Sequence, residues 1–81
     1  MGLHQVEFIT CYGERKKADK LSLFLEADKD GEPFYKIEGS CGGTVRFAIA
    51  FDKSPEAVMV RFRELAKELL AGQREQAERS V

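Results

Sequence analysis

The clearest pattern in the sequence is an alternation of apolar and polar residues that recurs in four separate stretches. Successive side chains of a β-strand point to opposite faces, so an apolar residue at every second position predicts a strand with one buried face. The most regular stretch is "TVRFAIAF" (44–51), in which one face is expected to carry Val45, Phe47, Ile49 and Phe51. The alternation predicts strands over 4–12, 21–27, 34–39 and 44–51.

Polar and glycine-containing segments separate these strands. "DKDGE" (28–32) predicts a hairpin turn, because Asp-Gly readily supplies a positive φ. "GSCGG" (39–43) also predicts a turn, in which the glycines at 39, 42 and 43 supply positive φ values. "GERKKADK" (13–20) opens with a glycine and is expected to be a polar, basic connection.

A helical spacing replaces the alternation after residue 53. Ser54, Pro55 and Glu56 suit the N-cap, the first helical position and the first turn of a helix. Apolar residues at helical spacing then form a stripe, which comprises Val58, Phe62, Leu65 and Leu69. The helix is expected to end at Gly72. Residues 73–81 have no apolar stripe, so they are expected to form a frayed helix or a flexible tail.

The order of these elements predicts a single α+β domain over residues 1–72. We expect an antiparallel four-stranded sheet (β-β-β-β-α) with one C-terminal helix packed on one face. The other face is then left open, and Phe24 and Phe34 fall on it beside Lys36 and Arg46. Because a curled sheet or a second molecule would cover such aromatic rings, these four residues are the candidate partner-binding residues.

Composition limits the classes of function. The chain has 81 residues, of which 13 are basic and 14 acidic, for a net charge of −1. A domain of this size needs most of its apolar residues for the core, which argues against a deep catalytic cavity. The near-neutral charge gives no overall attraction to nucleic acid or anionic membranes. The first residues lack the basic and apolar parts of a signal peptide, so we expect a soluble cytoplasmic protein.

Cys41, which stands between glycines, is the candidate nucleophile. A reactive thiol needs a cation, a histidine or a helix N-terminus beside it. The histidine, His4, and the helix start are both distant in sequence. We therefore favour a simple turn at Cys41 and retain a thiol-dependent activity there as a second alternative.

Metal and cofactor sites are not expected. Two cysteines and one histidine do not complete a tetrahedral zinc site, and no CxxC spacing occurs. "DKDGE" lacks the further ligands of a calcium loop. We expect Cys11 and Cys41 to be free thiols in a reducing compartment, with a disulfide between neighbouring strands as the open alternative.

The basic segment gives a different hypothesis. Its cations would contact phosphates if the segment were ordered, with Arg46 adding to them and Phe24 and Phe34 offering a stacking surface. The cations concerned are Arg15, Lys16, Lys17 and Lys20. The competing interpretation is a solubilising loop, because glutamates on the sheet remove the surplus of positive charge.

The run "LSLFLEADKDGEPFYKIEG" followed by "FDKSPEAVMVRFRELAKELL" resembles the layout of HicB-type antitoxin domains. The resemblance spans residues 21–70 and consists of a strand, an acidic Asp-Gly turn, a second strand and a Pro/Glu-Ala helix. A full strand, "TVRFAIAF", replaces the Pro-rich loop of that family. The resemblance implies a toxin-neutralising protein that acts by covering its partner.

The residues favour a small non-enzymatic module for protein interaction or regulation. It would be similar to an inhibitor or antitoxin, of the kind that phages and mobile elements encode. We expect it to bind another protein, or a second copy of itself as a homodimer, through the open sheet face or a strand edge. The first alternative is nucleic-acid binding by residues 15–20, and the second is the thiol of Cys41.

Overall fold

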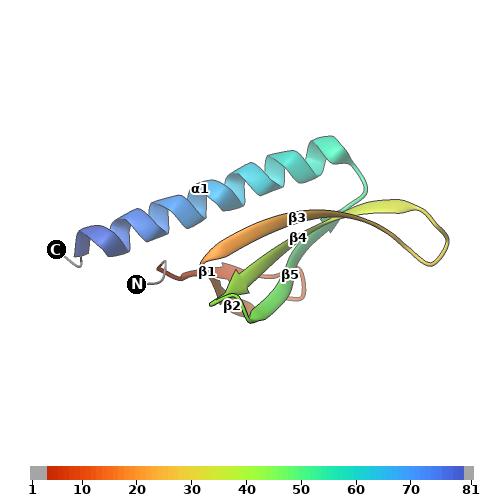
Figure 1. The fold of residues 1–81 in the computed structure, drawn as a ribbon. Coiled ribbons are helices and arrows are strands. Elements are labelled where there is room, and N and C mark those ends of the chain that lie inside the picture. Colours follow the sequence, from red (N-terminus) through yellow and green to blue (C-terminus); the bar gives the residue numbers. More distant parts are fainter. Residues whose placement is uncertain (1–3, 80–81) are drawn as a thin grey trace.

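The computed structural model describes residues 4–79 and has an α+β fold with one C-terminal helix above antiparallel strands (Figure 1). The elements are β1 (Val6–Ile9), β2 (Arg15–Ala18), β3 (Lys20–Ala27), β4 (Pro33–Cys41), β5 (Val45–Asp52) and α1 (Pro55–Arg79). The predicted fold class is confirmed. The single four-stranded sheet is wrong, because the strands form a β1–β2 sheet and a β3–β4–β5 sheet.

The fifth strand comes from the basic segment. Residues 15–18, expected within a connection, form β2 and pair with β1, with Glu7 opposite Lys17 and Ile9 opposite Arg15. The turn between these strands is tight because the Thr10 hydroxyl accepts hydrogen bonds from the amides of Tyr12 and Glu14, each at 3.2 Å. This turn ends β1 at Ile9, well before the predicted boundary.

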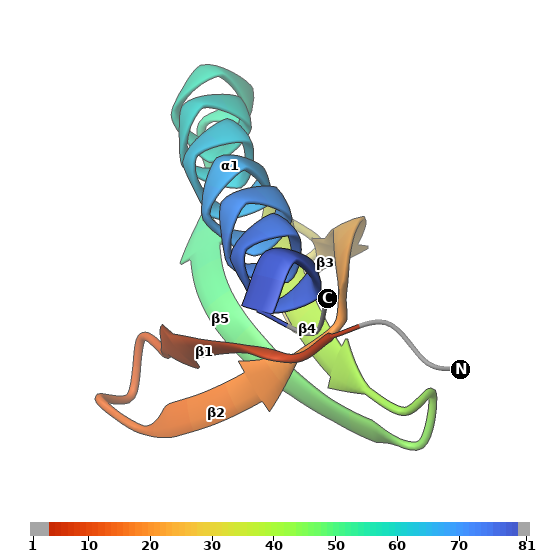
Figure 2. The ribbon, with the colours of Figure 1, turned by 90° about the vertical axis from the view of Figure 1, so that its left-hand side faces the viewer.

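The two sheets are joined by backbone hydrogen bonds. The Asp19 amide, between β2 and β3, donates to the Ser40 carbonyl at 2.9 Å, and the Cys11 amide donates to the Ile49 carbonyl at 2.8 Å. Figure 2 shows the β1–β2 hairpin lying below the C-terminal end of α1, beside β4 and β5. The strands therefore curl around one side of the helix.

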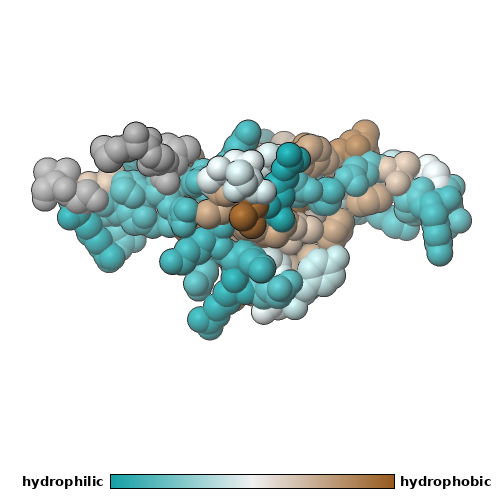
Figure 3. All heavy atoms as spheres, turned by 60° about the horizontal axis from the view of Figure 1, so that its bottom comes forward, coloured by the Kyte–Doolittle hydropathy of each residue, from teal (hydrophilic) through white to brown (hydrophobic). Residues whose placement is uncertain are grey.

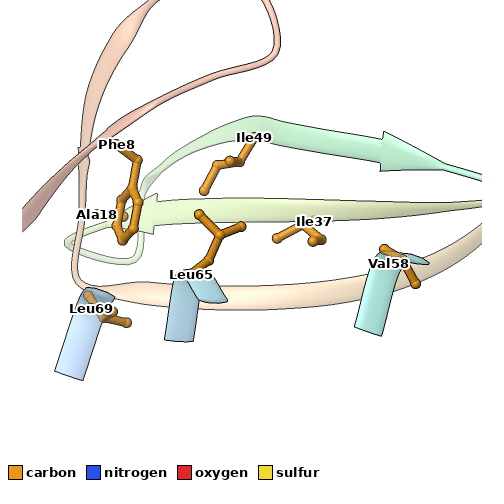
Figure 4. Packing of buried hydrophobic residues seen from close by; sticks show 7 residues of the cluster. All are labelled: Phe8, Ala18, Ile37, Ile49, Val58, Leu65 and Leu69. Carbon is orange, nitrogen blue, oxygen red and sulfur yellow. The ribbon is translucent and has the colours of Figure 1, made fainter. Parts of the chain in front are cut away.

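The core lies between α1 and the strands (Figure 4). Its buried apolar side chains come from all three units, the hairpin, the larger sheet and the helix, and comprise Phe8, Ala18, Ile37, Ile49, Val58, Leu65 and Leu69. Burial of a side chain of this kind stabilises a fold by about 1.5–3 kcal/mol. The helix stripe predicted from the sequence is confirmed, with Phe62 partly buried at its margin.

A β-bulge changes the faces of β5. Ile37 lies opposite Ala50 while the next residue, Glu38, lies opposite Ala48, so that Ile49 is the extra residue. Phe47 therefore faces the helix side beside Gly39, but Phe51 lies opposite Lys36 on the other face. The prediction that Phe51 shares a face with Phe47 and Ile49 is wrong, because a bulge shifts the alternation by one residue.

The helix begins as predicted and ends later. The Ser54 hydroxyl accepts a hydrogen bond from the Ala57 amide at 3.2 Å, which confirms the N-cap. The helix passes through Gly72 to Arg79, so the predicted end at Gly72 is wrong. The C-terminal part of the helix is held to the strands, because the Gln73 amide group donates to the carbonyl of His4, before β1, at 3.1 Å and to that of Asp19, between β2 and β3, at 3.2 Å.

Gly72 is present for close packing. A Cβ atom at this position would lie 2.6 Å from Cγ2 of Val6, well inside van der Waals contact. The glycine therefore lets β1 approach the helix.

We expect Gly72→Ala to destabilise the protein, although alanine is the better helix former by about 1 kcal/mol. Overpacking against Val6 costs about 1–3 kcal/mol and outweighs that gain. In a Val6→Ala background the contact is relieved, and the same Gly72→Ala change should stabilise. Urea unfolding of the four proteins measures this coupling. Equal effects of Gly72→Ala in both backgrounds would contradict the packing role.

Candidate functional site

The candidate site is the face of the β3–β4–β5 sheet that points away from α1, called the open face from here on. The strand register places Phe24 of β3, Lys36 of β4 and Phe51 of β5 in one cross-strand row, with Phe34 two residues before Lys36. Phe24 is 39% exposed and Phe51 is 42% exposed, while Phe34 is half-buried. Figure 3 brings this side forward and shows hydrophobic atoms in its centre and right half, with hydrophilic atoms around them.

The aromatic rings pack against one another. The ring centroids of Phe34 and Phe51 are 6.0 Å apart with the planes inclined at 50°. Tyr12, from the β1–β2 turn, meets Phe51 edge-on at 6.4 Å and 70°, and remains 69% exposed. The sequence prediction missed both Tyr12 and Phe51. A bulge has no sequence signal in "TVRFAIAF". The turn lies near β5 through long-range contacts, among them the hydrogen bond from the Cys11 amide to the Ile49 carbonyl, which the sequence does not indicate.

Lys36 lies at the centre of the open face, on the middle strand between Phe24 and Phe51. Its Nζ lies 2.7 Å from Oε2 of Glu26 and 2.9 Å from Oε2 of Glu38, and 5.5 Å from the ring centroid of Phe24. Hydrogen bonding to Glu26 and then to Glu38 raises the pKa of the Lys36 ammonium group above its ordinary value of 10.5, while desolvation opposes this shift. The lysine side chain is 20% exposed, so its neighbours cover most of it.

A shallow hollow adjoins this row on the open face. Its volume is about 260 Å³, and its polar lining includes Lys20, Ser22, Glu38 and Arg46, with Phe24 as the apolar part. Among the described residues, neither Lys20 nor Arg46 forms an ion pair. The structure therefore brings all four predicted partner-binding residues, Phe24, Phe34, Lys36 and Arg46, onto one face.

The basic residues predicted for nucleic acid are dispersed. Arg15 and Lys17 point to one side of β2, and Lys16 points to the other. The Nζ of Lys16 lies 3.7 Å from Oε2 of Glu14. Lys20 belongs to β3 and lines the hollow. These cations therefore do not form one continuous patch, because a strand alternates their directions.

The "GSCGG" segment is a strand end and a turn. Cys41 ends β4, and Gly42 and Gly43 have φ values of 64° and 76° in the turn to β5. The predicted turn is confirmed, but the role given to Gly39 is wrong. Gly39 lies inside β4, where a Cβ atom would come within 2.8 Å of the Phe47 ring, so it makes room for that ring. Cys11 and Cys41 are both free thiols.

Two further features bear on chemistry. Within residues 4–79 no three His, Cys, Asp or Glu side chains are grouped so that they would hold a metal ion. In the same part of the chain, α1 is too polar to cross a membrane and no other helix occurs.

We expect Lys36→Met to destabilise the fold between pH 7 and pH 10, because Glu26 and Glu38 then face each other without their shared cation. A raised folded-state pKa means that the stabilisation is fully present below the unfolded value near 10.5 and is lost as the pH rises through the folded value. The difference in unfolding free energy between wild type and Lys36→Met should therefore narrow above pH 10.5.

Chemical denaturation over pH 8–12 measures this difference, with Lys67→Met on the exposed side of α1 as the matched control. A difference for Lys36→Met that is constant over the whole range would contradict the ion-pair role.

Comparison with known proteins does not add to this geometry. No protein-family model, no curated protein and no solved structure matches the chain. The resemblance of residues 21–70 to HicB-type antitoxin domains therefore stays a prediction, and the function is argued from the residues of the open face.

Proposed function

We propose that the protein is a small non-enzymatic interaction module that binds a partner protein through its open face. The observation that carries this proposal is the presence of three phenylalanines, Phe24, Phe34 and Phe51, on three adjacent strands of a face that α1 does not cover. Large aromatic side chains dominate the energetics of protein interfaces.

The face is organised before any partner arrives. Phe34 is packed against Phe51, and Lys36 is fixed between two carboxylates beside Phe24. Side chains that are already ordered lose little conformational entropy on binding, which favours affinity for a given contact area. The rings are thus suited to receive apolar side chains of a partner.

The residues that line the hollow indicate which chemical groups the partner carries. Lys20 and Arg46 line it without a carboxylate of their own. A partner carboxylate placed there would form charge-assisted hydrogen bonds, which are about twice as strong as neutral ones. We therefore propose that the partner presents an apolar or aromatic residue close to an Asp or Glu.

A non-enzymatic role is consistent with the state of Lys36. A lysine that acts as a nucleophile or base needs a lowered pKa. The neighbours of Lys36 raise its pKa instead, and both carboxylates nearest to it are engaged in ion pairs. These groups support recognition better than proton transfer.

A photocrosslinker tests the proposal directly. Benzoylphenylalanine replaces Phe24 in one variant and Lys67, on the exposed side of α1, in a matched control. After irradiation in an extract of the source cell, the proteins attached only through position 24 identify the partner. A single specific protein is expected at position 24, and none in common with position 67.

With the purified partner, Phe24→Ser and Phe34→Ser should each weaken Kd by at least about tenfold, as interface anchors do. Val60→Ser, which removes a 57% exposed apolar residue from α1, should leave Kd unchanged. Equal losses for all three variants, or identical crosslinks at both positions, would contradict the proposal. Attachment of nucleic acid at position 24 would favour the alternative instead, with affinity that falls as salt rises.

A further inference from the structure

Strand β3 is an edge strand, and within residues 4–79 neither a bulge nor another strand protects its central part. It pairs with β4 in an unbroken register from Lys20 opposite Ser40 to Ala27 opposite Pro33, and no strand of the described residues lies on its other side. Its central residues, "LSLFL" (21–25), contain no charge, proline or glycine. Proteins usually protect such an edge with one of these residues, a bulge or a covering segment.

The opposite edge of the same sheet is protected. On β5 the bulge at Ile49 interrupts the register, and the Ile49 carbonyl already accepts the Cys11 amide at 2.8 Å. Tyr12 then covers part of Phe51. The two edges of this sheet therefore differ, and among the described residues the β3 edge is the one that no turn or bulge protects.

The flank of α1 above β3 is apolar. Gln73 shows which side of α1 faces β3, because its side chain donates a hydrogen bond to the carbonyl of Asp19, directly before β3. Helical spacing places four apolar residues on the same flank, Met59, Phe62, Ala66 and Leu70. Met59 is 42% exposed and Leu70 is 61% exposed, and on β3 itself Leu25 is 64% exposed on the helix side. An apolar surface thus runs along the open edge.

We propose that the occupant of this edge is a second copy of the same chain, paired antiparallel through β3 about a two-fold axis at Leu23. Residues directly opposite each other in an antiparallel pair lie on the same face of the sheet. The register that pairs the whole of residues 20–26 with themselves places Leu23 opposite Leu23, Leu21 opposite Leu25, and Lys20 opposite Glu26 of the second copy.

This register is complementary in charge as well as in polarity. Lys20 has no ion pair within the described part of the chain, and Glu26 retains a carboxylate side chain that is 38% exposed beside Lys36. The symmetry creates the Lys20–Glu26 pair twice. All six leucines of the two strands lie on the helix side, where they meet the apolar flanks of both helices.

The resulting dimer has one continuous six-stranded sheet. Each helix runs opposite to its own β3, because α1 follows β5, which is parallel to β3. The two helices are then antiparallel neighbours on one side, and the two open faces join on the other. This interface adjoins the proposed partner site, because Lys20 and Phe24 lie on β3. Phe34, Arg46 and Phe51 lie on β4 and β5, outside the paired strand.

Charge exchange at the edge tests the proposal. Lys20→Glu places two glutamates opposite each other at both ends of the interface, and Glu26→Lys places two lysines there. Each variant alone should dimerise at least about tenfold more weakly than wild type in sedimentation equilibrium, because like charges directly opposite are unfavourable. A mixture of the two variants restores both opposite-charge pairs, so it should form a heterodimer of wild-type affinity.

If the mixture dimerises as strongly as wild type, the weak dimerisation of each single variant is due to the interface and not to misfolding. Circular dichroism of each variant checks its fold. Glu64→Lys is the control, because this exposed residue lies on the side of α1 away from the Met59–Leu70 flank, and no effect on dimerisation is expected. A wild-type protein that is monomeric at millimolar concentration would overturn the proposal. So would a dimer that both variants leave intact, or a mixture that shows no heterodimer.

Discussion

Burial of the helix stripe against the central strands is the interaction on which the rest of the structure depends. Val58 and Leu65 of α1 lie within 1% of complete burial, as do Ile37 and Ile49 of β4 and β5. A single helix has one such stripe and covers one side of a sheet. The open face and the free edge of β3 are therefore consequences of the same packing. The β1–β2 hairpin closes the remaining side of the core with Phe8 and Ala18.

The bulge at Ile49 connects the core with the open face. It keeps Phe47 and Ile49 on the helix side, where Gly39 makes room for both, and sends Phe51 to the other side next to Phe34. A regular strand would have put Phe51 in the core and left the open face with two phenylalanines. One extra residue in β5 therefore extends the aromatic surface to all three strands.

Much of the fold could be predicted because its signals are local. The cap at Ser54, the turn at Gly31 and the helix stripe each depend on residues close together in the sequence. β2 was missed because "RKKA" has no apolar alternation, and its extended form depends on pairing with β1. The end of the helix was misplaced for a related reason. Glycine is a residue type that commonly ends helices, but Gly72 is needed for close packing against Val6, which lies 66 positions earlier in the sequence.

Asp19 gives the molecule a mechanical property. Its amide bonds to Ser40, its carboxylate accepts the Gly42 amide at 3.0 Å, and its carbonyl accepts the Gln73 side chain. One residue thus fastens the small hairpin, the β4–β5 turn and the C-terminal part of the helix. Opening any of these parts breaks a hydrogen bond of Asp19, which couples the small hairpin to the rest of the fold. The chain should lose and regain its structure as one cooperative unit.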